Sequence, residues 1–184
     1  EKAKTWIEQA KKSDKPFMLM MQHKAPHREW KPGPNELSLY KDVVFPEPAN
    51  LFDKYENRGR AAKEQDLSLE KTLRLAEDLK IYGKEGTEAI RRFNTEQRAA
   101  WDKVYEPIIA DFHSKDLKGK ELLKWKYQRY MQDYLACVAS VDKSVGQIQE
   151  YLKETGLDEN TIVIYSSDQG FYLGEHGWFD KRFM

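Results

Sequence analysis

Residues 162–181 read IVIYSSDQGFYLGEHGWFDK. This stretch begins with an apolar run rich in β-branched residues, which is typical of a strand buried inside a parallel sheet. Small and oxygen-bearing side chains follow at once, where the strand must end. In open α/β sheets, ligands bind beyond the carboxyl ends of the strands. The sequence therefore predicts a functional site around Asp168 and Gln169.

A second apolar run, FMLMM at residues 17–21, has the same character. It lies between Pro16 and Gln22 and suits a covered strand better than a helix. The loop behind it, residues 23–32, reads HKAPHREWKP and combines two histidines and three cations with two prolines. Prolines restrict the backbone, and histidine titrates near neutral pH. We therefore predict a second functional segment at this strand end, centred on His27.

Helices are expected between these two strands and before the first one. Apolar spacing predicts helices over residues 4–12 and 118–154, the last ended by Gly156. A capping arrangement of Asn94 and Gln97 predicts a third helix over residues 94–114, kinked or restarted at Pro107. A helix, a tight turn and a buried strand make half of a βαβ unit. The predicted class is α/β, with a mixed, mostly parallel sheet flanked by helices. Residues 58–93 are charged and only weakly periodic, and their pattern does not choose between a strand and an amphipathic segment.

The amino-acid composition limits the classes of function that this chain can have. The 184 residues fit one domain, and 31 Lys plus Arg balance 31 Asp plus Glu, which gives no support for nucleic-acid binding. No apolar run approaches the roughly 20 residues of a membrane span, and the N-terminus lacks a signal-peptide core. The single cysteine, Cys137, excludes an internal disulfide and a thiolate zinc site, and we expect it to be a small buried hydrophobe.

Each candidate residue also has a simpler interpretation. Asp168 would equally well cap a helix that begins at Gly170. Carboxylate and amide oxygens suit calcium or magnesium, but two ligands leave a calcium site incomplete, because calcium takes roughly 6 to 8 oxygens. Taken alone, His27 reads as a loop histidine bonded to backbone, and Lys181 as a solvated surface lysine.

Several blocks of the sequence together resemble the type I sulfatases. Residues 15–19 followed by 23–32 resemble the family block in which an apolar strand delivers a Pro-His pair into the active site. Residues 167–177 with Lys181 resemble the block after it, and residues 134–152 are similar to the helix before that block. The resemblance implies a partial alkaline-phosphatase-like α/β fold that hydrolyses sulfate esters, often on sugars.

The resemblance also implies roles for seven residues. They are Asp168 and Gln169 as ligands of Ca²⁺ or Mg²⁺, His27 and Lys181 as catalytic residues, and His23, Lys24 and His176 as contacts to the sugar. These roles are chemically coherent. A cation and an ammonium group stabilise charge on a sulfuryl group, and an imidazole near neutrality donates a proton to the departing alcohol.

The departures from the family pattern are equally informative. The nucleophile motif, Cys or Ser followed by x-Pro-x-Arg, is absent, and Cys137 is followed by VASV and cannot supply it. The N-terminal Asp-Asp metal pair is absent as well. We therefore expect residues 1–184 to form a single partial catalytic domain, truncated at both ends, without the formylglycine nucleophile or the C-terminal subdomain. The isolated chain is expected to be inactive.

The expected function is hydrolysis of a sulfuric ester on a carbohydrate, such as a 6-sulfated amino sugar of a glycosaminoglycan or mucin. By resemblance, the expected location is periplasmic, secreted or lysosomal. Two alternatives stay open. One is another alkaline-phosphatase-like enzyme, a phosphodiesterase or phosphonate hydrolase. The other is a non-catalytic α/β interaction fragment, for which the incomplete site argues.

Overall fold

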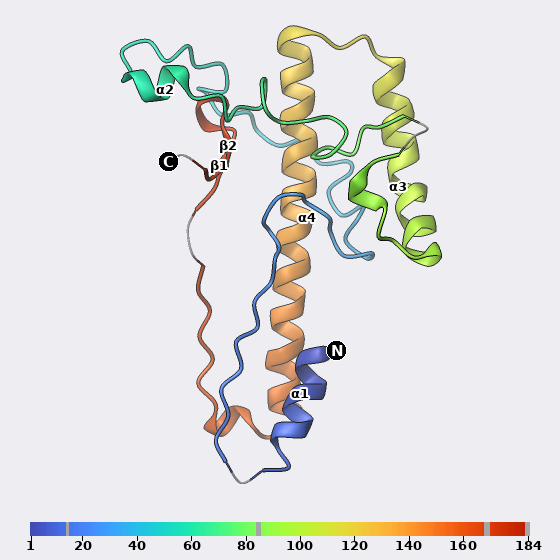
Figure 1. Cartoon of the computed structure of the whole chain (residues 1–184), viewed down its shortest axis with the longest axis vertical. Coiled ribbons are helices and arrows are strands. Elements are labelled where there is room, and N and C mark those ends of the chain that lie inside the picture. The colour runs from blue at the N-terminus through green and yellow to red at the C-terminus, as the bar shows by residue number, and fades with distance from the viewer. Residues whose placement is uncertain (14, 84–85, 168–169, 183–184) are drawn as a thin grey trace.

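A single long helix, α4 (Gly119–Glu154), runs through most of the molecule in this computed structural model (Figure 1). The structure describes residues 1–13, 15–83, 86–167 and 170–182. As the sequence predicted, α4 ends at a glycine in the left-handed region: Gly156 has φ +68°, and Leu157 N–H donates to the Leu152 carbonyl. Within the described residues, no helix combines the length and apolar character needed to cross a membrane.

The other elements are shorter. They are α1 (Lys2–Ala10), α2 (Arg60–Glu64), α3 (Thr95–Ser114), the 3₁₀ turns η1 (Glu88–Ile90), η2 (Asp158–Asn160) and η3 (Glu175–Gly177), and the strands β1 (Tyr172–Leu173) and β2 (Phe179–Asp180). The predicted start of α3 is confirmed by a capping box, in which Asn94 and Gln97 exchange hydrogen bonds. Pro107 lies inside α3 without ending it.

The predicted parallel sheet is wrong for the described residues. Residues 17–21 and 162–165 are extended and run beside the lower half of α4, but neither forms a named strand (Figure 1). The sheet described here is a two-stranded antiparallel pair, with Tyr172 opposite Asp180. A covered strand needs neighbouring strands and helices on both faces. The described part of the chain leaves Met18 79% and Ile162 90% exposed.

The core lies beside the upper half of α4, where segments distant in sequence meet. Tyr127 and Tyr130 of α4 are buried against Trp30, Leu69 and Phe179. The prediction that the tyrosines of this helix belong to the core is therefore confirmed. The core brings the loop after residues 17–21 against α4 and against β2.

A buried group of charges joins α4 to α3 and to the irregular segment 66–83. Asp133 accepts hydrogen bonds from Lys80 Nζ at 2.9 Å, from the Tyr105 hydroxyl at 2.8 Å and from the Arg129 guanidinium. Burial alone would raise the pKa of Asp133, but Arg129 and Lys80 hold that pKa below its ordinary value. The carboxylate is therefore ionised and compensated inside the core.

Candidate active site

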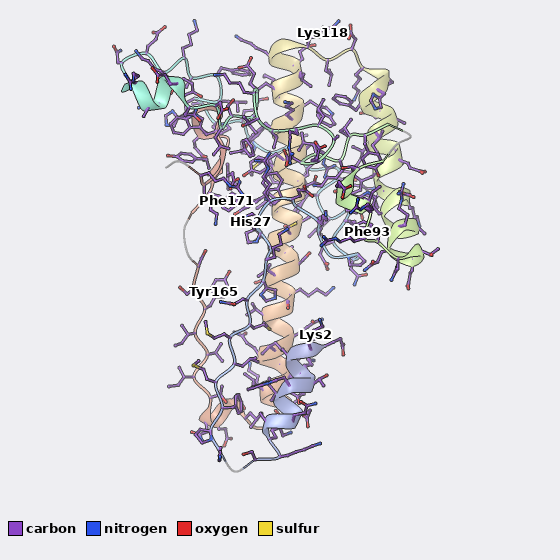
Figure 2. All side chains as sticks on the ribbon, viewed as in Figure 1. Lys2, His27, Phe93, Lys118, Tyr165 and Phe171 are labelled. Atoms are coloured by element: carbon purple, nitrogen blue, oxygen red, sulfur yellow. The ribbon has the colours of Figure 1, made fainter. Side chains whose placement is uncertain are left out.

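The two predicted strand ends converge on the core, although the described residues form no sheet between them. Figure 2 labels His27 and Phe171, which mark where the two extended segments reach the core. Trp30, fully buried, anchors the first segment with its ring centroid 4.7 Å from Tyr130 and 6.2 Å from Phe179. The aromatic core therefore fixes the loop that carries His27 against the segment that carries Lys181.

The imidazole of His27 has a defined orientation. Its Nδ1 lies 2.6 Å from the Arg28 carbonyl, which can only accept, so Nδ1 carries a proton. Its Nε2 lies 3.4 Å from an Arg182 guanidinium nitrogen, which can only donate. Nδ1 is therefore held by the Arg28 carbonyl, and Nε2 is the ring nitrogen on the Arg182 side.

Arg28 is held by the carboxylate of Asp78, which is fully buried. The guanidinium donates from Nε at 2.7 Å and from Nη2 at 2.6 Å, a bidentate pair. It also donates to the Thr72 carbonyl at 3.2 Å and lies 5.0 Å from the centroid of the Phe179 ring. One side chain thus joins the His27 loop to segment 66–83 and to β2.

A cavity of about 620 Å³ opens beside this pair. Its lining residues are Arg28, Glu29, Lys71, Thr72, Arg74 and Arg182. Four of these six side chains are cations, and three of the four are paired with carboxylates: Arg28 and Arg74 with Asp78, and Arg182 with Asp180.

Lys181, the second predicted catalytic residue, lies on the segment that contacts His27. Its backbone N–H donates to Asp180 Oδ1 at 2.9 Å, and its sequence neighbour Arg182 contacts His27 and pairs with Asp180. Asp180 is fully buried and has φ +66°. The structure therefore places Lys181 and His27 on two segments that touch.

His176, a predicted sugar contact, lies in a separate polar and aromatic cluster. Its Nδ1 is 2.6 Å from Asp53 Oδ2, and its carbonyl accepts from the Tyr55 hydroxyl at 2.6 Å. The hydrogen bond from His176 holds the pKa of Asp53 below its ordinary value. The ring lies 5.3 Å from that of Trp178. Because Asp53 engages this ring, the cluster fixes its orientation.

The remaining predicted sugar contacts, His23 and Lys24, are exposed. His23 Nε2 lies 2.9 Å from Ser144 Oγ on α4, and the Lys24 carbonyl accepts from His27 N–H at 2.9 Å. The contacts described here give His23, His27 and His176 no shared partner.

The predicted metal ligands, Asp168 and Gln169, lie outside the described residues. Among the residues that are described, no group of three or more His, Cys, Asp and Glu side chains is arranged to hold a metal ion. The helix expected to begin at Gly170 under the alternative interpretation is absent, because the described chain leads from Gly170 into β1.

Cys137 is buried in the core on α4, as predicted. Burial raises the pKa of its thiol to about 12. A thiol with such a pKa is almost entirely protonated near neutral pH, and the thiolate is the nucleophilic form. Cys137 is therefore a packing residue and not a nucleophile.

Sequence reasoning gave no role to Asp78 or Arg182. Asp78 lies in the segment with no clear periodicity, and it pairs with a residue 50 positions away. Arg182 follows the predicted lysine directly, and only the fold brings it to His27. Charge patterning gives no signal for such long-range pairs.

The family profile described as Sulfatase matches residues 1–182. N-acetylglucosamine-6-O-sulfatase of Bacteroides thetaiotaomicron is 49% identical over 193 residues, which cover 100% of this chain and 34% of that protein. The solved structure of BT4656 in complex with its substrate D-glucosamine-2-N,6-O-disulfate superposes with a TM-score of 0.91 and 49% identity, covering 100% of this chain and 39% of that one.

A more distant similarity also bears on function. The multifunctional alkaline phosphatase superfamily protein PehA of Trinickia caryophylli is 31% identical over 65 residues, covering 35% of this chain and 13% of that protein. The chain thus spans about a third of the length of the first two relatives and much less of this one.

Proposed function

Because this chain belongs to the sulfatase family, we propose that the complete protein hydrolyses sulfate esters and that residues 1–184 form part of its catalytic domain. The observation that carries the proposal is the contact between the His27 loop and the Lys181 segment through Arg182. The exposed apolar segments 17–21 and 162–165 support the assignment to part of a domain. Their composition is typical of inner strands, which pair with further strands in a complete sheet.

The proposed substrate is a 6-sulfated amino sugar within a sulfated carbohydrate. Support comes from the relative named N-acetylglucosamine-6-O-sulfatase and from the solved structure whose stated substrate is D-glucosamine-2-N,6-O-disulfate. His23, Lys24 and His176 are the proposed contacts to the sugar. A periplasmic, secreted or lysosomal location accompanies this proposal.

The chemistry assigned to this chain is charge stabilisation and proton delivery. Hydrolysis breaks the bond between sulfur and the sugar oxygen, and the departing oxygen must gain a proton. His27 holds its Nδ1 proton on the Arg28 carbonyl, so Nε2 is the atom that takes up a proton and passes it to the leaving oxygen. The Lys181 ammonium stabilises the charge on the sulfuryl oxygens.

Two further groups complete the proposed site. Asp168 and Gln169 would supply two hard oxygen donors for Ca²⁺, or for Mg²⁺, with the other ligands from outside this chain. A cation held by these residues would supply Lewis-acid polarisation of the sulfate oxygens. The oxygen donors of Asp168 and Gln169 suit such a cation. The described residues contain no other group of side chains arranged to hold a metal ion. A formylglycine nucleophile is proposed in the part of the protein that precedes residue 1.

Phosphoester or phosphonate hydrolysis is the second candidate. Its support is the similarity to the multifunctional alkaline phosphatase superfamily protein, which extends over a third of this chain. A sulfate monoester carries one negative charge and a phosphate monoester about two at neutral pH. The same cationic groups would bind both esters, so the two activities are distinguished by the rates at which the esters are hydrolysed.

The test compares two esters that differ only in the transferred group. The complete protein, with calcium present, is incubated with D-glucosamine 6-sulfate and with D-glucosamine 6-phosphate, and the released anion is measured. We expect kcat/KM for the sulfate ester to be at least about 100-fold higher, a difference of about 2.7 kcal/mol in transition-state stabilisation. A preference for the phosphate ester would replace the proposal with the second candidate.

A further inference from the structure

We propose that the buried carboxylate of Asp78 is a positioning residue for His27 and that it acts through Arg28. This inference rests on the proposed catalytic role of His27. The structure joins the three residues in one chain of contacts: Asp78 binds the Arg28 side chain, and the Arg28 carbonyl binds the His27 ring.

The first link is the side chain of Arg28. The Arg28 side chain is 16% exposed and that of Asp78 is 0% exposed, so this bidentate pair is largely shielded from solvent. Burial alone would raise the pKa of Asp78, but hydrogen bonds from Arg28 and Arg74 hold that pKa below its ordinary value. The carboxylate therefore stays ionised at neutral pH and keeps Arg28 in place.

The second link is the backbone of the same residue. The Arg28 carbonyl lies 2.6 Å from His27 Nδ1, and a carbonyl oxygen can only accept a hydrogen bond. This contact selects the tautomer with the proton on Nδ1 and orients the ring. His27 Nε2 then lies 3.4 Å from an Arg182 guanidinium nitrogen. Ring orientation thus depends on where the Arg28 carbonyl sits.

Removing the charge of Asp78 breaks the chain of contacts at its start. Asparagine keeps one oxygen that can accept from Arg28 but loses the charge and the second oxygen, so the guanidinium is left with one neutral acceptor, the Thr72 carbonyl and the Phe179 ring. An uncompensated buried charge is unfavourable, so Arg28 moves until it reaches water. Its carbonyl moves with it. The His27 ring loses its fixed acceptor, and both tautomers become populated.

The test measures kinetics and tautomer state in the complete enzyme. Asp78→Asn keeps the side-chain size and removes the charge. We expect kcat for D-glucosamine 6-sulfate to fall about 10- to 100-fold, since small misplacements of a reacting group have effects of this size, while KM stays within about threefold. Arg28→Lys, which keeps the charge but not the bidentate geometry, is expected to lower kcat in the same way.

Nitrogen NMR of ¹⁵N-histidine-labelled enzyme reports the tautomer directly. The His27 signals, assigned by comparison with His27→Ala, should show protonated Nδ1 in the wild type and a mixture of tautomers in Asp78→Asn. This readout does not depend on which ester the enzyme hydrolyses. A wild-type enzyme without sulfatase activity but with the expected tautomer shift would overturn the proposed function and leave the positioning role standing.

Asp133→Asn is the matched control. Asp133 is also a buried aspartate that binds two cations, but it contacts neither His27 nor Arg28. We expect this variant to lower the melting temperature without changing kcat per folded molecule or the His27 signals. Two results would overturn the inference: an unchanged kcat and tautomer in both folded Asp78→Asn and Arg28→Lys, or an equal kcat loss in Asp133→Asn. If Asp78→Asn does not fold, Arg28→Lys alone decides.

Discussion

Replacing His27 with alanine in the complete enzyme is expected to lower kcat for a sugar sulfate about 100- to 10,000-fold, the range typical of losing a general acid. The departing sugar oxygen would leave as a strongly basic alkoxide, so it needs a proton as the bond to sulfur breaks. His27 is the proposed donor: its Nδ1 is tied to the Arg28 carbonyl, so a proton would pass through Nε2, the ring nitrogen on the Arg182 side.

The choice of leaving group sharpens this prediction. A nitrophenyl sulfate expels a weakly basic phenolate that needs little protonation, so the same variant should lose much less activity with it. His113 on α3 is exposed and has no proposed role, and His113→Ala is the matched control, expected to keep wild-type kcat with both esters. Equal losses for the two esters in His27→Ala would show that His27 is not the proton donor.

Asp133→Ala is expected to lower the free energy of unfolding by about 3–5 kcal/mol, the range for breaking a buried ion pair by removing one partner. It would leave Lys80 (0% exposed) and Arg129 (6% exposed) without their carboxylate, and Tyr105 without its acceptor. The effect arises mainly from stranded charges inside the core, not from lost attraction.

Urea unfolding of the complete protein, followed by circular dichroism, measures this difference. Asp142→Ala is the matched control, because Asp142 is an exposed aspartate on the same helix, and its change should stay within about 0.5 kcal/mol. The pH dependence gives a second check. The lowered pKa of Asp133 means that its stabilisation is complete above the unfolded pKa and is lost as pH falls through the lower folded value. An Asp133→Ala variant as stable as Asp142→Ala would contradict this account.

The helices were predictable because their signals are local. The capping box of Asn94 and Gln97, the stripe of tyrosines on α4 and the left-handed Gly156 each act within a few residues of the feature that they define. The sheet was not predictable in the same way. Residues 17–21 and 162–165 have strand composition, but pairing needs other strands at their edges, and the described residues give them none.

The candidate site likewise has one part that local sequence signals predicted and another that they did not. The segments that carry His27 and Lys181 follow apolar runs, a local signal, and the structure brings these segments together. The pairing of Arg28 with Asp78 spans 50 residues and depends on the core between them, so no local pattern indicated it. Asp168 and Gln169 were identified by resemblance, and their role as metal ligands stays a prediction.

The central claim is that His27 and Lys181 face the same sulfate ester. A crystal structure of the complete enzyme with D-glucosamine 6-sulfate bound tests it most directly. We predict His27 Nε2 within about 3.2 Å of the oxygen that bridges sulfur and sugar, and Lys181 Nζ within about 3.2 Å of a terminal sulfate oxygen. A bound sulfate ester that contacts neither side chain would contradict the account.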